Sequence, residues 1–331
     1  MTSFVNQNNL NTVRRIIVLG SMLAFLGLTL NVAAQDSSTQ AYEAYQAGKT
    51  KASEKQYEEA IASFQQAIEV GDPEKSYDAN IIDAAQKGMA AATLNMGTQL
   101  RNDKDFDGAL NAYVKALETG QEAESEKVVK IAKANGTRVA YVRGNELKKE
   151  EQYEKALETY NKGIGLDSSY YKNFLGHAQS LEKLDEPIKA MKGYLKAGDI
   201  CLADEDEEIV AKGEKMYKKA ANMVAVTWSD KDWDTVVEMA NIFLEKQESA
   251  DVHYYLGDAL LEQGMTDKAL MHAEQAMETG ELDEDTKGKY LMLKGGALEK
   301  QGKTAEAIEA YKMVSGKYTE SASYRIKELG G

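Results

Sequence analysis

A glycine followed by an alanine twelve residues later recurs five times in this chain, and this repetition restricts the possible folds more than any other feature. The pairs are Gly48 with Ala60, Gly97 with Ala109, Gly144 with Ala156, Gly257 with Ala269, and Gly295 with Ala307. Around each pair, a stretch with the apolar period of an α-helix is followed by a short polar turn and a second such stretch. Because glycine and alanine offer little bulk, two helices can approach closely at these positions. We interpret them as packing positions of a repeated helical hairpin and not as a chemical site.

The composition supports helices along the whole chain of 331 residues, which is rich in Ala, Glu, Lys and Leu and contains only 2 prolines. Alanine and long unbranched side chains lose little rotamer freedom in a helix. The alternation of apolar and polar residues that marks a β-strand is absent. We therefore expect an all-α protein.

An aromatic residue often begins the second helix of a copy, as Tyr57, Phe106 and Tyr153 do. This pattern resembles the tetratricopeptide repeat family, whose unit is a helix–turn–helix of about 34 residues. The resemblance implies a right-handed α-solenoid of about seven units over residues 41–320, closed by a C-terminal capping helix and tail at 321–331. The approximate units are 41–74, 90–123, 137–170, 171–204, 217–250, 250–283 and 288–320.

The spacing between copies is longer than the family unit at several points. Between the alanine or valine anchors of successive second helices, the intervals are 49, 47, 34, 46, 33 and 38 residues. The extra residues keep a helical pattern. We therefore expect some lengthened helices and a less regular solenoid than in a consensus array.

The first 34 residues have the layout of a secretory signal peptide. Two arginines precede an apolar run over residues 16–30, and Val32 and Ala34 suit the subsites before a cut near Ala34–Gln35. The run is short for the ~20 residues needed to span a bilayer. We expect cleavage, a flexible lead over 35–40, and a periplasmic or secreted protein without stable membrane insertion of the mature chain. An uncleaved membrane anchor is the alternative.

The chain is strongly acidic, with 54 acidic against 40 basic residues and a formal net charge of −14. Removing residues 1–34 takes away two positive charges, so the mature chain carries −16. A chain of this charge should not bind nucleic acid through its overall field. Cys201 is the only cysteine, so an intrachain disulfide is impossible and stability must come from packing.

The sequence contains no recognisable catalytic or cofactor-binding motif. The nucleophile pattern G-x-S-x-G and the phosphate-binding loop G-x-x-x-x-G-K-[ST] are both absent. His177, His253 and His272 have no metal-ligand spacing to one another, and we expect each to be a surface or groove residue. The acidic runs 204–208 and 281–286 lack the EF-hand pattern and are interpreted as solvated turns, with weak calcium binding as the alternative. We expect no enzymatic activity, no cofactor and no metal site.

The resemblance also places the first helix of each unit along the concave groove of the solenoid. The partner-binding set that it implies is Tyr42, Tyr45, Arg138, Tyr141, Asn145, Lys148, Tyr254 and Asp258. Tyrosine supplies rigid contact area with a polar tip, which suits peptide recognition, although some of these tyrosines could instead pack between repeats. We expect a non-enzymatic scaffold of the cell envelope that binds a protein or peptide in this groove. The groove residues of chaperone-tail-binding members are not reproduced, which disfavours such a tail as the ligand.

Two further features leave alternatives open. The window Lys127–Lys149 contains seven positive residues and one negative residue, so it is either a docking surface for an acidic segment or a C-terminal carboxylate, or a solvated helical face. Trp228 and Trp233 could stack on sugars, which makes a glycan-binding or nutrient-uptake accessory protein of the envelope the alternative function. Since Trp233 begins a second helix, core packing is its alternative role. The oligomeric state stays open.

Overall fold

The computed structural model describes residues 37–279 and 282–331. The predicted signal peptide, its cleavage point and the first two residues of the predicted lead lie outside the described residues. The expectation of a flexible lead is wrong for residues 37–40, which form the first turn of α2 (Ser37–Ser53). The helix extends this far because Ala41 and Ala44 are buried and anchor the turns that follow.

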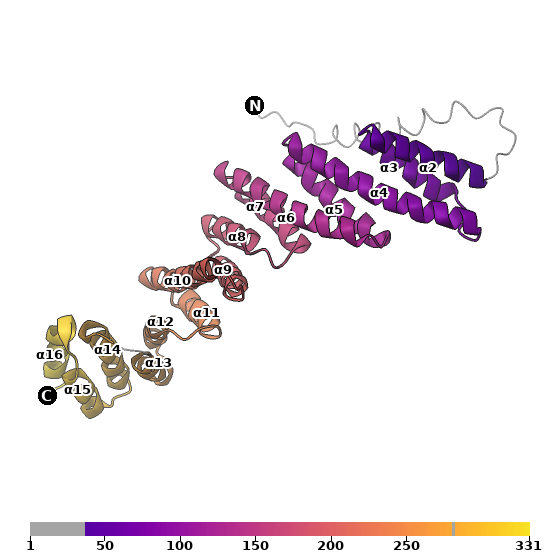
Figure 1. Ribbon diagram of the computed structural model, residues 1–331. Coiled ribbons are helices and arrows are strands. Elements are labelled where there is room, and N and C mark those ends of the chain that lie inside the picture. Colours follow the sequence, from indigo (N-terminus) through magenta and orange to yellow (C-terminus); the bar gives the residue numbers. More distant parts are fainter. Residues whose placement is uncertain (1–36, 280–281) are drawn as a thin grey trace, which may run out of the picture. The chain divides into compact units, whose positions relative to one another are not determined.

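Every regular element in the described ranges is helical, which confirms the all-α prediction (Figure 1). Fifteen α-helices and one 3-10 helix follow one another, and these ranges contain no strand. The remaining elements are α3 (Tyr57–Val70), α4 (Ser76–Asn102), α5 (Phe106–Glu122), α6 (Glu126–Lys149), α7 (Tyr153–Leu166), α8 (Tyr171–Lys183), α9 (Pro187–Leu202), α10 (Glu207–Ser229), α11 (Trp233–Leu244), α12 (Ala250–Glu262), α13 (Thr266–Glu278), α14 (Glu284–Lys300), α15 (Thr304–Lys312), η1 (Gly316–Tyr318) and α16 (Thr319–Glu328). None of the helices in these ranges has the length and the hydropathy that a membrane span requires.

Three of the helices that open a hairpin are lengthened, as the spacing between copies predicts. α4 has 27 residues, α6 has 24 and α10 has 23, whereas α8 and α12 have 13 each. The extra residues between copies therefore extend helices and do not form long loops. The limits that we assigned to the seven repeat units stay a prediction.

The chain divides into two compact units, each of which is described by itself. The first unit contains the described residues up to Asn95 together with 119–125, and the second contains 96–118 and 126–331. In the first unit, the buried ring of Phe64 packs directly against two glycines. A Cβ atom added at Gly48 or at Gly88 would lie 2.7 Å from this ring. The aromatic ring of α3 therefore fills the space that the glycines leave open.

In the second unit, each helix from α6 to α15 packs against the next helix along the chain. Contacts also join first helices of neighbouring hairpins, namely α6 with α8, α10 with α12, and α12 with α14. The largest core cluster extends from α8 to α14 and includes Val224, Met239, Phe243 and Leu256. This order of contacts is that of a helical repeat, in which each hairpin buries its apolar face against its neighbours.

The repeated glycines of the second unit are packing positions. A Cβ atom at Gly144 would lie 2.5 Å from the buried ring of Tyr160 in α7. At Gly257, an added Cβ would lie 2.9 Å from Leu293 of α14 and 3.3 Å from the carbonyl oxygen of Ala269 in α13. Glycine at these positions therefore lets a first helix approach both its own partner helix and the next hairpin.

A short C-terminal segment covers the last hairpin of the second unit. η1 packs against α14, and α16 packs against α15. Ala322 is buried there, and Ile326 and Leu329 pack against the cluster that contains Leu291 and Leu298. The helix that we expected from residue 321 begins two residues earlier, at Thr319.

Candidate partner-binding surfaces

Four of the predicted site residues lie along one face of α6. Arg138, Tyr141, Asn145 and Lys148 follow one another at intervals of 3, 4 and 3 residues, and these intervals return to the same side of an α-helix. The Arg138 side chain is exposed, and the other three are half-buried. The face is therefore accessible while most of its side chains are held by neighbours.

Tyr141 is held by residues at the start of α8. Its ring stands edge-on to Tyr170, with 6.2 Å between the ring centroids. The Nζ atom of Lys172 lies 5.9 Å from the centroid of the Tyr141 ring, within the range of a cation–π contact. Burial raises the pKa of the Tyr170 hydroxyl, so this group stays neutral and able to donate a hydrogen bond.

Asn145 and Lys148 are positioned by hydrogen bonds to other helices. Asn145 Oδ1 accepts a hydrogen bond of 3.0 Å from the hydroxyl of Tyr160, the residue that also fills the space over Gly144. The amide nitrogen of Asn145 has no hydrogen-bond partner among the described residues and is free to donate. Lys148 Nζ donates to Oε1 of Gln179 in α8, and burial lowers the lysine's pKa.

A pocket of about 500 Å³ opens beside Lys148. Its lining contains two more lysines, Lys183 and Lys219, and one carboxylate, Glu182. The carboxylate accepts hydrogen bonds from the Tyr194 hydroxyl at 2.7 Å and from Lys219 Nζ at 2.6 Å. Three positive charges against one negative charge suit an anionic group. The α6–α8 surface is defined as Arg138, Tyr141, Asn145, Lys148, Tyr170, Lys172 and Gln179 together with this pocket.

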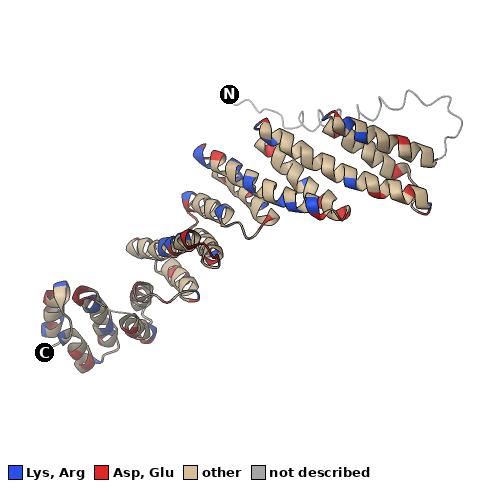
Figure 2. Ribbon diagram, viewed as in Figure 1, with Lys and Arg blue, Asp and Glu red and all other residues tan. Residues whose placement is uncertain are grey.

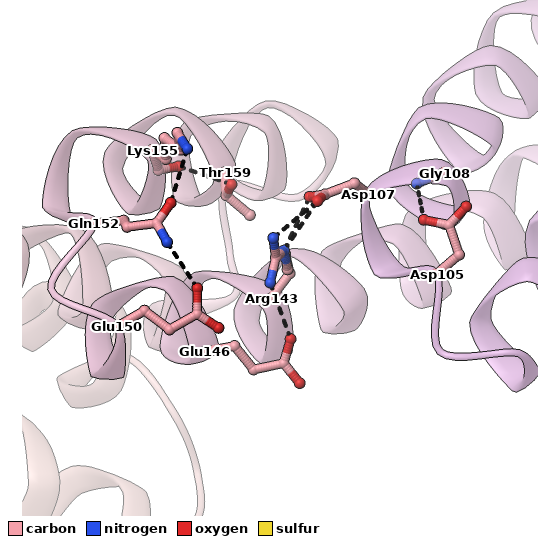
Figure 3. Close-up of polar contacts among 9 residues, drawn as sticks. All are labelled: Asp105, Asp107, Gly108, Arg143, Glu146, Glu150, Gln152, Lys155 and Thr159. Atoms are coloured by element: carbon pink, nitrogen blue, oxygen red, sulfur yellow. Dashed lines mark hydrogen bonds and ion pairs between the residues drawn. The ribbon is translucent and has the colours of Figure 1, made fainter.

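The basic window of the sequence falls on α6 (Figure 2). One of its charges is compensated, because Arg143 Nε donates to both carboxylate oxygens of Asp107 at 3.1 Å and an ion pair of 3.4 Å joins it to Glu146 (Figure 3). The bond with Asp107 is the main reason why the pKa of Arg143 is raised. Five positive side chains of the window are exposed and make no ion pair within the described residues, namely Lys127, Lys130, Lys133, Arg138 and Lys149. The docking interpretation of the window stays a prediction.

Tyr254 lies in an aromatic cluster that joins three first helices. Its ring centroid is 5.8 Å from that of Trp228 in α10 and 5.6 Å from that of Tyr290 in α14. Lys289 Nζ lies 4.4 Å from the centroid of the Tyr254 ring and donates to Oδ1 of Asp251 at 3.0 Å. The ammonium group is therefore held between aromatic rings and a carboxylate of its own chain. Burial raises the pKa of Tyr254 above its ordinary value, so its hydroxyl stays neutral.

Asp258 meets the same tryptophan one helical turn further along α12. Its Oδ2 atom accepts a hydrogen bond of 2.8 Å from the indole nitrogen of Trp228. Burial raises the pKa of Asp258, and the hydrogen bond from Trp228 partly opposes this effect. The structure thus brings Tyr254 and Asp258 together through Trp228, on a surface separate from that of α6.

The two remaining predicted residues belong to the first unit. Tyr42 of α2 is 44% exposed, so its ring is available to a ligand. Tyr45 is half-buried, with its ring centroid 6.0 Å from that of Phe64. Packing therefore accounts for much of Tyr45, the role that we gave as the alternative for these tyrosines.

One expectation for the histidines is wrong, because His253 is buried, with 4% of its surface exposed. His253 and His272 face each other across α12 and α13, with 3.1 Å between their Nδ1 atoms, and His253 Nε2 lies 2.8 Å from Glu248. Helix spacing could not predict this pair, because it depends on how the two helices of the hairpin face each other. The described residues contain no group of three or more side chains arranged to hold a metal ion.

Comparisons with known sequences identify the type of repeat. Sequence profiles of the tetratricopeptide repeat match residues 44–70, 137–170 and 290–321. These three segments of the chain are therefore similar to the tetratricopeptide repeat. A search of curated proteins found no match.

Several solved structures of tetratricopeptide repeat proteins are similar to the chain. The TPR2AB domain of yeast Sti1 in a complex with pHSP90 is 16% identical, with a TM-score of 0.30, over 74% of this chain and 100% of that one. YrrB, described as having an unusual peptide-binding site, is 18% identical, with a TM-score of 0.30, over 61% of this chain and 90% of that one. A repeat protein from Parabacteroides merdae is 15% identical, with a TM-score of 0.26, over 88% of this chain and 100% of that one.

The matched repeat at 137–170 contains the predicted α6 residues. Arg138, Tyr141, Asn145 and Lys148 lie on its first helix, and Tyr160 lies on its second. The repeat therefore supplies both the exposed face and the tyrosine that supports it. Tyr254 and Asp258 lie outside the matched segments.

Several residues of the two surfaces were missed by sequence reasoning. Gln179 and Lys172 of α8 hold Lys148 and Tyr141, and Lys289 and Tyr290 of α14 complete the aromatic cluster. A search for tyrosines on first helices would have found Tyr290, because it lies on the first helix of the predicted unit 288–320. The two lysines and the glutamine carry no such signal, since they contact side chains of other helices.

Proposed function

We propose that the chain is a non-enzymatic scaffold that binds an acidic segment of a partner protein on the α6–α8 surface. The observation that carries the proposal is the pocket beside Lys148, whose lining has three lysines and one glutamate in a chain of net charge −14. A local excess of positive charge on an acidic protein attracts acidic segments selectively and speeds their encounter. Arg138 and the free amide nitrogen of Asn145 extend the donor groups along the helix.

The rest of the proposal concerns the class of protein and its location. The matching sequence profiles describe a structural repeat and not an enzyme, which supports a binding role. The charged, apolar and small-residue pattern before Gln35 supports export to the cell envelope. Crosslinking in the native envelope, followed by mass spectrometry, tests both the location and the identity of the partner.

A binding measurement tests the α6–α8 surface directly. We expect a fluorescein-labelled hexaglutamate peptide to bind the mature chain in an anisotropy titration, with an affinity that falls as salt is added. The double variant Arg138→Glu/Lys148→Glu should weaken this binding by at least about tenfold, because it reverses two charges of the surface.

A matched control reverses two positive charges outside the α6–α8 surface. Lys155 and Lys162 are exposed on α7, outside the pocket, so Lys155→Glu/Lys162→Glu alters the net charge equally. This control should bind the peptide with little change. Equal affinities of the two double variants would show that the α6–α8 surface is not the binding site.

A further inference from the structure

Both tryptophans of the chain line one pocket in the second unit. The sequence contains 2 tryptophans, and Trp228 and Trp233 lie on either side of the turn between α10 and α11. The pocket has a volume of about 440 Å³, within the range of sites for small ligands. Its other lining residues are Ser229, Lys231, Asp258 and Glu262. The pocket therefore combines two indole rings with two carboxylates.

The wall that Trp228 forms is fixed before any ligand arrives. Its indole nitrogen donates to Asp258 at 2.8 Å, and its ring centroid lies 5.8 Å from that of Tyr254 and 5.2 Å from that of Tyr255. Trp233 packs against the core of the second unit and is partly exposed. Rings that are held in this way lose little freedom when a ligand stacks on them.

The carboxylates of the pocket are only weakly compensated. Asp258 and Glu262 are four residues apart and share one face of α12. Asp258 is half-buried, and its only hydrogen bond within the described residues comes from the neutral indole of Trp228. Lys300 Nζ is 3.8 Å from Glu262 Oε1, and this pair is about half exposed, so it contributes little. Lys231, which also lines the pocket, is exposed and forms no ion pair with a described residue.

We propose that this pocket binds the guanidinium group of an arginine side chain presented by a partner protein. A guanidinium is flat, weakly hydrated and stacks on indole faces, while its N–H groups pair with carboxylates. A neutral sugar could stack on the same indoles, but it carries no charge to pair with Asp258 and Glu262, whereas a guanidinium does both. The site lies on α10–α12, so its test does not depend on the α6–α8 surface.

Tryptophan fluorescence reports on this pocket alone, because the chain has no tryptophan elsewhere. The probe is the peptide acetyl-Gly-Arg-Gly-amide, and the control probe replaces arginine by citrulline, its neutral isostere. We expect a saturable change in emission with the arginine peptide. The citrulline peptide should bind at least about tenfold more weakly, a difference of about 1.4 kcal/mol.

Two variants and one control link the signal to the carboxylates. Glu262→Gln and Asp258→Asn should each weaken binding of the arginine peptide several-fold, and the asparagine can still accept the hydrogen bond from Trp228. Glu238→Gln changes an exposed glutamate of α11 outside the pocket and should leave binding unchanged. Melting curves followed by circular dichroism show whether each variant is folded.

Three results would overturn the inference. These are equal responses to the arginine and citrulline peptides, an unchanged affinity in folded Glu262→Gln, or a response only to a neutral sugar such as chitotriose. The last result would instead support stacking of a glycan on the tryptophans. Because the hexaglutamate titration uses another surface and another signal, failure of one experiment leaves the other to be judged separately.

Discussion

Single residues determine how closely the helices approach one another. Glycine is required at position 144 because the ring of Tyr160 occupies the space that a side chain would need. The hydroxyl of the same tyrosine donates a hydrogen bond to Asn145 on the exposed face. Gly165 of α7 is different, since an added Cβ would meet no atom within 4 Å. The same residue type therefore has opposite energetic consequences at two places in one hairpin.

This contrast predicts the effect of adding one methyl group. Gly144→Ala should lower the free energy of unfolding by about 1–3 kcal/mol, because the methyl group overpacks against Tyr160. Gly165→Ala should raise the free energy of unfolding by up to about 1 kcal/mol, because alanine favours helix and meets no obstacle. Urea unfolding of both variants tests the prediction, which fails if they shift in the same direction.

The histidine pair predicts a dependence of stability on pH. Burial, followed by the charge of His253, lowers the pKa of His272, while the negative charge of Glu248 opposes the shift. The unfolded chain, where the pKa is about 6.5, therefore takes up the proton first as the pH falls. The stability that neutral His272 contributes to the folded state is therefore complete above about pH 6.5, and it is lost as the pH falls through the lower pKa of the folded protein.

The measurement compares melting temperatures at pH 7.5 and pH 5.5. His272→Gln should lose less stability than the wild type over this interval, because it removes one group that titrates. An equal loss in both proteins would show that His272 does not contribute.

At the scale of whole elements, the C-terminal helix has a clear role. α16 covers the last hairpin, and Arg325 joins it to α14 through a hydrogen bond of 3.2 Å to Glu299. Without this helix, the apolar residues Leu298 and Val314 would lose part of their cover. A repeat array needs such a terminal element with a polar outer side.

Removal of the cap should therefore expose apolar surface. Deleting residues 319–331 should lower the melting temperature and increase the binding of the dye ANS, because the last hairpin loses its outer layer. Deleting only Gly330 and Gly331 provides the control and should change neither quantity. Identical ANS binding by both truncated chains would contradict the capping role of α16.

At the scale of the molecule, the second unit is held together mainly by contacts between neighbouring helices. Such a unit transmits a local loss of packing over short distances, since each hairpin contacts only its neighbours. Its single cysteine, Cys201, is buried, and the pKa of its thiol is raised by burial and then by Asp204. Packing between helices is therefore the main source of stability, as expected for a chain without an intrachain disulfide.

This arrangement predicts that damage stays local. Tyr311→Ala removes a buried ring at a cost of about 3–5 kcal/mol. Amide hydrogen exchange should then accelerate in α14–α16 and remain unchanged in α6–α8. Tyr324→Ala, which removes a ring that is 61% exposed, serves as the control. Faster exchange throughout the second unit would show that it unfolds as a single cooperative block.

The sequence by itself determined the helices, their pairing into hairpins and which first helices are lengthened. These properties depend on local information, because the period of about 3.6 residues and the small residues at fixed offsets lie within one hairpin. It also placed Arg138, Tyr141, Asn145 and Lys148 on one helical face, since a helix turns by a constant angle per residue.

Only the tertiary structure decided which side chains from different helices meet. Trp228 and Asp258 are 30 residues apart and share a hydrogen bond, whereas no offset within one hairpin would pair them. The contact of Lys148 with Gln179 and the burial of His253 depend in the same way on the packing of neighbouring helices. Small changes in helix length or crossing angle move such contacts by several ångströms, so their positions follow from the assembled core and not from the helical period.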